Sequence, residues 1–173
     1  MEAKTHITTS LTLAAGISKY LALPFTVGYL AGTVLGSVLP DIDKKDSFIG
    51  QRSLGISHLV QMLFGHRGFT HSVLCWVIIS IICLNYPSAF TYGLLIGYIG
   101  HIIGDFFSNR GVPILYPIIK KPFSPPSFLT YRTSSTSESI IFVSSIVILL
   151  IMVLDDSLID ELVHSIEQLV SRF

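Results

Sequence analysis

The chain has 173 residues, of which 50% are hydrophobic and only 13% are charged, and its mean hydropathy is +0.67. Ordinary soluble domains carry about 25% charged residues, so this composition argues for a membrane protein and against a soluble one. The formal net charge is zero, so no overall electrostatic field indicates a nucleic-acid partner.

The first apolar block, residues 11–39, is long for one membrane helix, and Lys19 and Pro24 interrupt it near its middle. We therefore divide it into a hairpin of two helices, over residues 6–21 and 24–39, with Pro24 in the first turn of the second helix, where its missing N–H costs nothing. The second helix carries a glycine at every fourth position: Gly28, Gly32 and Gly36. This spacing permits close packing of helices in lipid.

Three further apolar blocks, at residues 73–84, 90–107 and 139–154, complete a predicted all-α bundle of about five membrane helices. Most of the five are slightly shorter than the roughly 20 residues that an untilted span needs, so a bundle half-sunk in one leaflet is the alternative. The polar stretch at residues 108–138 contains several prolines, which disfavours a long helix there.

The last segment, residues 155–173, has apolar residues at helical spacing and an acidic opposite face, which predicts an amphipathic surface helix. We expect one domain over residues 1–173, made of a helical core (1–154) and this C-terminal helix.

The ionisable residues gather on one side of the membrane in this topology. They are His6, Asp41, Asp43, His66, Arg67, His71, His101, Asp105 and Glu138. If the first block were a single span, His6 would lie opposite the others. All Lys and Arg residues except Lys19 and Arg172 also fall on this side, and the positive-inside rule therefore places it in the cytoplasm.

His101 and Asp105 are four residues apart in an apolar segment, so they share one helix face where ionisable groups are costly and usually functional. The pair predicts either a shared metal ion or a His–Asp hydrogen bond. In the segment GHRGFTHS, residues 65–72, we expect His66 and His71 to be ligands and Arg67 to hold a substrate phosphate. His58 and His164 lack such partners and are interpreted as ordinary histidines.

The whole set is too rich in ligands for one structural zinc and would suffice for two divalent ions that activate water and clamp a phosphate. The absence of cysteine ligands from this set favours zinc, manganese or iron at a hydrolytic site. The sequence thus predicts a two-ion hydrolytic centre, with zinc favoured.

The segments TH, LPDID, HRGFTHS, GHIIGDFFSNRGVPILYP and TSSTSE occur in this order and together resemble the YdjM-type family of membrane-bound, metal-dependent hydrolases. The resemblance covers residues 4–152 and implies an inner-membrane protein with hydrolase activity. It implies metal ligands at His6, Asp41, Asp43, His66, His71, His101, Asp105 and Glu138, and catalytic roles for Asp43, Arg67, Thr70 and Glu138. Ser134 stands where the family usually has glycine, in the turn four residues before Glu138.

The order of these ligands is also similar, by analogy, to that of zinc-dependent phospholipases C and single-strand nucleases. We therefore expect a phosphoesterase that acts on a phospholipid or lipid-linked phosphate, with Asp43 or Glu138 as the proton acceptor. A metal transporter or sensor, and a non-catalytic membrane protein, are the alternatives; transport sites usually lie near the bilayer midplane, whereas these ligands gather at one end of the helices. The oligomeric state is left open.

Overall fold

A computed structural model describes the chain except residues 54, 66, 155 and 172–173. The described residues form α-helices and short 3-10 helices without a β-strand, which confirms the all-α class. In chain order the elements are α1 (Ala3–Leu21), α2 (Val27–Val38), η1 (Leu39–Asp43), η2 (Gly50–Arg52), α3 (Ile56–Phe64), η3 (Phe69–His71), α4 (Val73–Leu84), α5 (Ala89–Phe106), η4 (Ser127–Leu129), α6 (Thr136–Val153) and α7 (Asp156–Val170).

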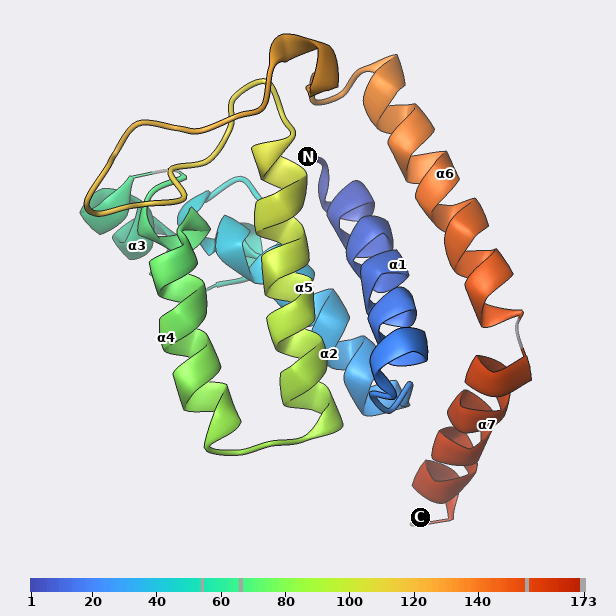
Figure 1. The fold of residues 1–173 in the computed structure, drawn as a ribbon. Coiled ribbons are helices and arrows are strands. Elements are labelled where there is room, and N and C mark those ends of the chain that lie inside the picture. The colour runs from blue at the N-terminus through green and yellow to red at the C-terminus, as the bar shows by residue number, and fades with distance from the viewer. Residues whose placement is uncertain (54, 66, 155, 172–173) are drawn as a thin grey trace.

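Helix α5 is the centre of the bundle, and α1, α2 and α4 pack against it, while α6 packs on the outer side of α1 (Figure 1). The N-terminus, the end of α5 and the start of α6 lie at the same end of the bundle (Figure 1). The long connection between α5 and α6 crosses over this end (Figure 1). The arrangement therefore brings chain segments that are far apart in sequence to one end of the helices.

The predicted division of the first apolar block is confirmed, because α1 ends at Leu21 and α2 begins at Val27. The expected place of Pro24 is wrong, since it lies in the connection and not in the first turn of α2. The side chain of Thr26 caps α2 instead, accepting a hydrogen bond of 3.3 Å from the N–H of Tyr29. A polar side chain that satisfies a free N–H sets the start of the helix here.

Glycines hold α2 and α5 in close contact, as their spacing in the sequence predicts. A Cβ added at Gly32 or Gly36 would collide with the carbonyl oxygen of Phe90 or Leu94, respectively, on α5. Gly93 and Gly97 on α5 likewise face carbonyl oxygens of α2. The two backbones therefore touch without side chains between them, which fixes the end of α2 beside the second half of α5, where the carbonyl oxygen of Ser37 meets the ring of His101.

Gly36→Ala is expected to destabilise the protein by about 1–3 kcal/mol, because the new methyl group must push the backbone of α5 away. Gly28→Ala is the matched control on the same helix, since the nearest atom to its added Cβ is 3.8 Å away. Alanine favours a helix over glycine, so the control is expected to be neutral or slightly stabilising. Denaturant unfolding in detergent measures both, and equal effects of the two substitutions would contradict this packing.

The five predicted membrane spans are not confirmed. Among the described residues, α6 has both the length, 18 residues, and the mean hydropathy, 2.2, needed to cross a membrane, and only 11% of it is buried. Helices α2 and α4 have 12 residues each, well short of the roughly 20 of an untilted span. Helix α3 was not predicted at all, although its exposed apolar residues at helical spacing, Ile56, Leu59, Met62 and Leu63, were visible in the sequence.

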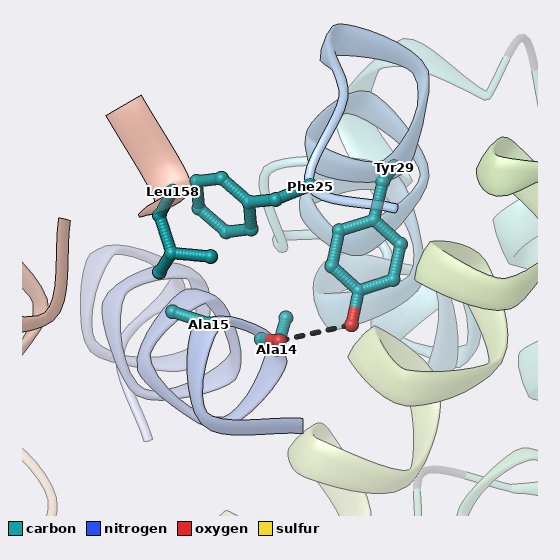
Figure 2. Packing of buried hydrophobic residues seen from close by; sticks show 5 residues of the cluster. All are labelled: Ala14, Ala15, Phe25, Tyr29 and Leu158. Carbon is teal, nitrogen blue, oxygen red and sulfur yellow. Dashed lines mark hydrogen bonds between the residues drawn. The ribbon is translucent and has the colours of Figure 1, made fainter. Parts of the chain in front are cut away.

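The predicted C-terminal amphipathic helix is present as α7. Its buried residue Leu158 packs with Ala14, Ala15, Phe25 and Tyr29, where the Tyr29 hydroxyl donates to the carbonyl of Ala14 over 2.9 Å (Figure 2). This contact joins α7 to α1 and to the start of α2. This apolar cluster lies at the end opposite the connection between α5 and α6 (Figure 1). A second cluster, formed by Cys75, Tyr98, Ile102 and Val112, lies near that connection.

Candidate metal centre

The residues that the sequence singled out come from five helical elements and one turn that meet at the end of the bundle beneath the α5–α6 connection. His6 lies in the first turns of α1, Asp41 and Asp43 in η1, Thr70 and His71 in η3, His101 and Asp105 in the last turns of α5, and Glu138 in the first turn of α6. Arg67 lies in the turn before η3, and the predicted ligand His66 lies outside the described residues. All of the described ones except Asp41 and Arg67 are at least nine-tenths buried.

Four possible ligand atoms converge at the centre of this group. Nε2 of His71 is 3.2 Å from Nε2 of His101, and it is 3.8 Å from Oδ1 of Asp41 and 3.7 Å from Oδ2 of Asp105. Nε2 of His101 is 3.9 Å from the same Asp41 oxygen and 4.0 Å from the same Asp105 oxygen. Ligands about 2.0–2.1 Å from a tetrahedral zinc ion are about 3.3 Å apart, so the atoms of His71, His101 and Asp41 need only a small contraction to enclose one ion. Oδ2 of Asp105 lies beside both histidine atoms and can complete the set.

The other ring nitrogen of each histidine is already hydrogen-bonded. Nδ1 of His101 is 2.7 Å from the carbonyl oxygen of Ser37, and Nδ1 of His71 is 3.1 Å from Oδ2 of Asp43. A carbonyl or carboxylate oxygen only accepts, so Nδ1 carries the proton in both neutral rings. The two Nε2 atoms then present lone pairs to one another across 3.2 Å, which is unfavourable unless a cation lies between them. This donor set fits a divalent metal ion.

Asp43, which the sequence predicts as a ligand, lies behind the ring of His71 in this arrangement. Its Oδ2 atom accepts hydrogen bonds from the Thr70 hydroxyl at 2.7 Å and from the backbone N–H of Arg67 at 2.8 Å, in addition to His71. Asp43 and Thr70 thus orient the ring of His71 from behind. Carboxylates that bond the far nitrogen of a ligating histidine fix its orientation and raise its basicity.

His6 and Asp105 form a second possible binding position beside the first. The ring of His6 stacks on that of His101 with centroids 3.7 Å apart, and neither of its buried ring nitrogens has a hydrogen-bond partner. Its Nε2 atom is 3.4 Å from Oδ1 of Asp105, which also accepts a 2.6 Å bond from the α-amine of Met1. Asp105 thus directs one oxygen to each position. Unpaired buried polar groups are costly, and a bound cation would satisfy His6.

Arg67 is held at the edge of the centre by its backbone and its side chain. Its φ is 56°, in the left-handed region, and its Nη2 atom is 2.7 Å from Oδ2 of Asp105. Its Nη1 atom donates to the Ser108 hydroxyl and to the carbonyl of Gly111, at 3.2 and 3.1 Å. Its buried Nε atom has no hydrogen-bond partner. The guanidinium thus lies next to the ligand atoms and partly neutralises Asp105.

Glu138 is set apart from both groups of possible ligands. Its two oxygens accept hydrogen bonds of 2.6 Å each from the backbone N–H groups of Glu2 and Ser134. Ser134 has φ of 58°, a left-handed conformation that suits the glycine expected at this position. Glu138 therefore clamps the N-terminus to the chain that precedes α6, and its carboxylate is not free to bind an ion in this arrangement.

Several residues that sequence reasoning missed support the centre. The Tyr98 hydroxyl donates to the carbonyl of Thr70 over 2.6 Å, and the Tyr131 hydroxyl donates to the carbonyl of Gly104 over 2.9 Å. Burial raises the pKa of Tyr131, and nearby Asp105 and Glu138 add to the effect, so this hydroxyl stays a neutral donor. The signal for Tyr98 was its place one helical turn before His101, on the same face of α5.

A polar pocket of about 490 Å³ opens beside the possible ligands and shares Asp41 and Arg67 with them. Its other lining residues are Met1, Lys44, Asn109, Arg110, Arg132, Thr133 and Ser134. A volume of this size lies within the roughly 300–1,000 Å³ of small-molecule sites. The pocket gives a ligand access to the otherwise buried centre.

Comparison with known proteins adds the family context. A profile of the family described as YdjM inner membrane protein matches residues 1–158. Inner membrane protein YdjM of Escherichia coli strain K12 is 34% identical over 129 residues, which cover 68% of this chain and 66% of that protein, and the protein of the same name from Shigella flexneri matches equally well. Uncharacterized protein YvsG of Bacillus subtilis strain 168 is 32% identical over 143 residues, which cover 82% of this chain and 87% of that protein. No solved structure matches.

Proposed function

Because the chain belongs to the YdjM family of inner membrane proteins, we propose that it is a membrane-embedded, metal-dependent phosphoesterase acting on a phospholipid or a lipid-linked phosphate. The observation that carries the proposal is the pair of facing Nε2 atoms of His71 and His101, 3.2 Å apart, whose Nδ1 atoms are both already bonded. The adjoining cationic pocket supports an anionic substrate over a neutral one.

His71, His101, Asp41 and Asp105 would hold one divalent ion, and His6 with the second oxygen of Asp105 would contribute to holding another. Nitrogen and oxygen donors in this combination suit zinc best, with manganese and iron as the alternatives. When bound, such ions lower the pKa of water and polarise phosphoryl oxygens.

The chain's own groups would orient the substrate and accept the proton. Arg67 lies between Asp105 and the pocket, where its guanidinium can turn to a phosphate as a two-pronged donor. Asp43 and Glu138 already accept hydrogen bonds within the protein, which makes them poor proton acceptors in this arrangement. Asp41 is the carboxylate of the centre that lines the pocket, and its possible ligand atom is Oδ1, so we assign proton acceptance to its other oxygen, Oδ2, in their place.

Arg67→Lys is expected to leave the metal content unchanged and to lower the turnover of a chromogenic phosphate ester by at least about tenfold, because a point charge replaces a two-pronged donor. Elemental analysis and a hydrolysis assay on detergent-purified protein measure the two effects. Arg52→Lys is the matched control, since exposed Arg52 stacks on Phe48 away from the pocket. Loss of metal from Arg67→Lys would instead make Arg67 a support for the ligands.

The proposal places the site on the cytoplasmic face of a multi-pass protein, because most Lys and Arg residues flank that end. In a chain whose Cys75 and Cys83 are replaced by alanine, Asp46→Cys is then expected to resist an impermeant thiol reagent in intact cells. Asn85→Cys, in the turn at the other end of α4, is expected to react. Both positions are exposed, and the reverse pattern of labelling would invert the orientation.

A further inference from the structure

The pocket beside the candidate metal centre gathers cations from separate parts of the chain. Lys44 follows η1, Arg67 precedes η3, Arg110 follows α5 and Arg132 precedes α6. Asp41 is the one carboxylate among the lining residues. Exposed cations are usually solvated singly, and bringing four of them to one concave surface raises their mutual repulsion unless an anion binds there.

Three of these cations form no polar interaction with other side chains in the described part of the chain. Arg67 pairs with Asp105. Among the described residues, the side chains of Lys44, Arg110 and Arg132 form no hydrogen bond or ion pair. All three are exposed. Their positive charge is therefore available to a ligand in the pocket, on the side of Arg67 that faces away from His71 and His101.

We propose that this pocket is a subsite for a second phosphoryl group, so that the substrate class is a lipid diphosphate. The inference rests on the proposed function and refines it. A single phosphodiester carries one negative charge, which Arg67 and the metal centre already match, and leaves three cations unmatched. A zwitterionic headgroup would bring an ammonium group against Lys44, Arg110 and Arg132 and be repelled, whereas a second phosphoryl group accepts charge-assisted hydrogen bonds from them.

Inorganic pyrophosphate and inorganic phosphate are the probes, titrated calorimetrically into the full-length protein in a non-ionic detergent, first with its metal and then after chelation. We expect pyrophosphate to bind at least about tenfold more tightly than phosphate. The double variant Arg110→Gln with Arg132→Gln is expected to lose this preference. Lys120→Gln with Lys121→Gln removes the same charge from exposed residues outside the pocket and is expected to keep it.

A preference that survives in the Arg110→Gln, Arg132→Gln protein, or that disappears equally in the lysine control, would overturn the subsite. A second arm repeats the titration in micelles containing phosphatidylglycerol, which we expect not to displace pyrophosphate. Displacement would show that the cations attract the anionic bilayer surface, and would also overturn the proposed subsite. If the protein binds no metal but the chelated sample still prefers pyrophosphate through Arg110 and Arg132, the hydrolase proposal fails and the subsite stands. If the protein hydrolyses its substrate but shows no preference for pyrophosphate, the hydrolase proposal stands and the subsite fails.

Discussion

Asp105→Asn is expected to abolish metal binding and hydrolysis together. Asp105 directs Oδ2 toward His71 and His101 and Oδ1 toward His6, so its single charge serves both possible ion positions. The amide keeps the size of the side chain and some of its hydrogen bonds but removes that charge. Loss of a supporting partner behind a ligand typically costs about 10–100-fold in metal affinity, so loss of this ligand should cost at least as much.

Elemental analysis of folded, detergent-purified protein measures the Asp105→Asn effect, with His58→Ala as the control. His58 is exposed on α3 and belongs to neither group of possible ligands. Full metal occupancy in Asp105→Asn, together with loss of metal from His58→Ala, would show that the metal site does not lie at this end of the bundle.

Asp43→Asn is expected to weaken metal binding by about 10–100-fold without abolishing it. The carboxylate of Asp43 lies behind His71, where it accepts from the ring Nδ1 and from the Thr70 hydroxyl. An amide in its place loses the negative charge and can turn its NH2 group toward His71, which favours the wrong ring tautomer. The ligand atoms remain present but are less well oriented and less basic.

Glu138→Gln is the matched comparison for Asp43→Asn, because Glu138 is an equally buried carboxylate that also accepts backbone N–H groups. We expect Glu138→Gln to retain its metal affinity, measured by competition with a chromophoric chelator. A loss as large as that of Asp43→Asn would show that Glu138 supports or holds the ion, as the sequence motif implied, and would contradict its separate place here.

The sequence predicted the helical framework best where a local rule decides the outcome. Lys19 and Pro24 indicated the break between α1 and α2, and the spacing of Gly32 and Gly36 indicated close packing, which α5 provides. The number of spans was predicted less well, because 12-residue apolar helices such as α4 satisfy a hydropathy pattern without the length of a span.

The site was predicted as a set of residue types, but roles within the set depend on which atom faces which. Spacing placed His101 and Asp105 on one helix face, and the structure brings their side chains to within 4.0 Å. No spacing rule could show that Asp43 lies behind His71, or that backbone N–H groups of Glu2 and Ser134 occupy Glu138. Those contacts depend on how η1, η3 and the chain before α6 fold against each other.

The content of divalent metal in the purified wild-type protein tests the central claim most directly. The measurement is elemental analysis by mass spectrometry after purification under metal-replete conditions and removal of free ions. The account predicts at least about one ion per chain, held by His71, His101, Asp41 and Asp105 and reduced by substitution of either histidine. A folded wild-type protein that carries no divalent metal under these conditions would contradict it.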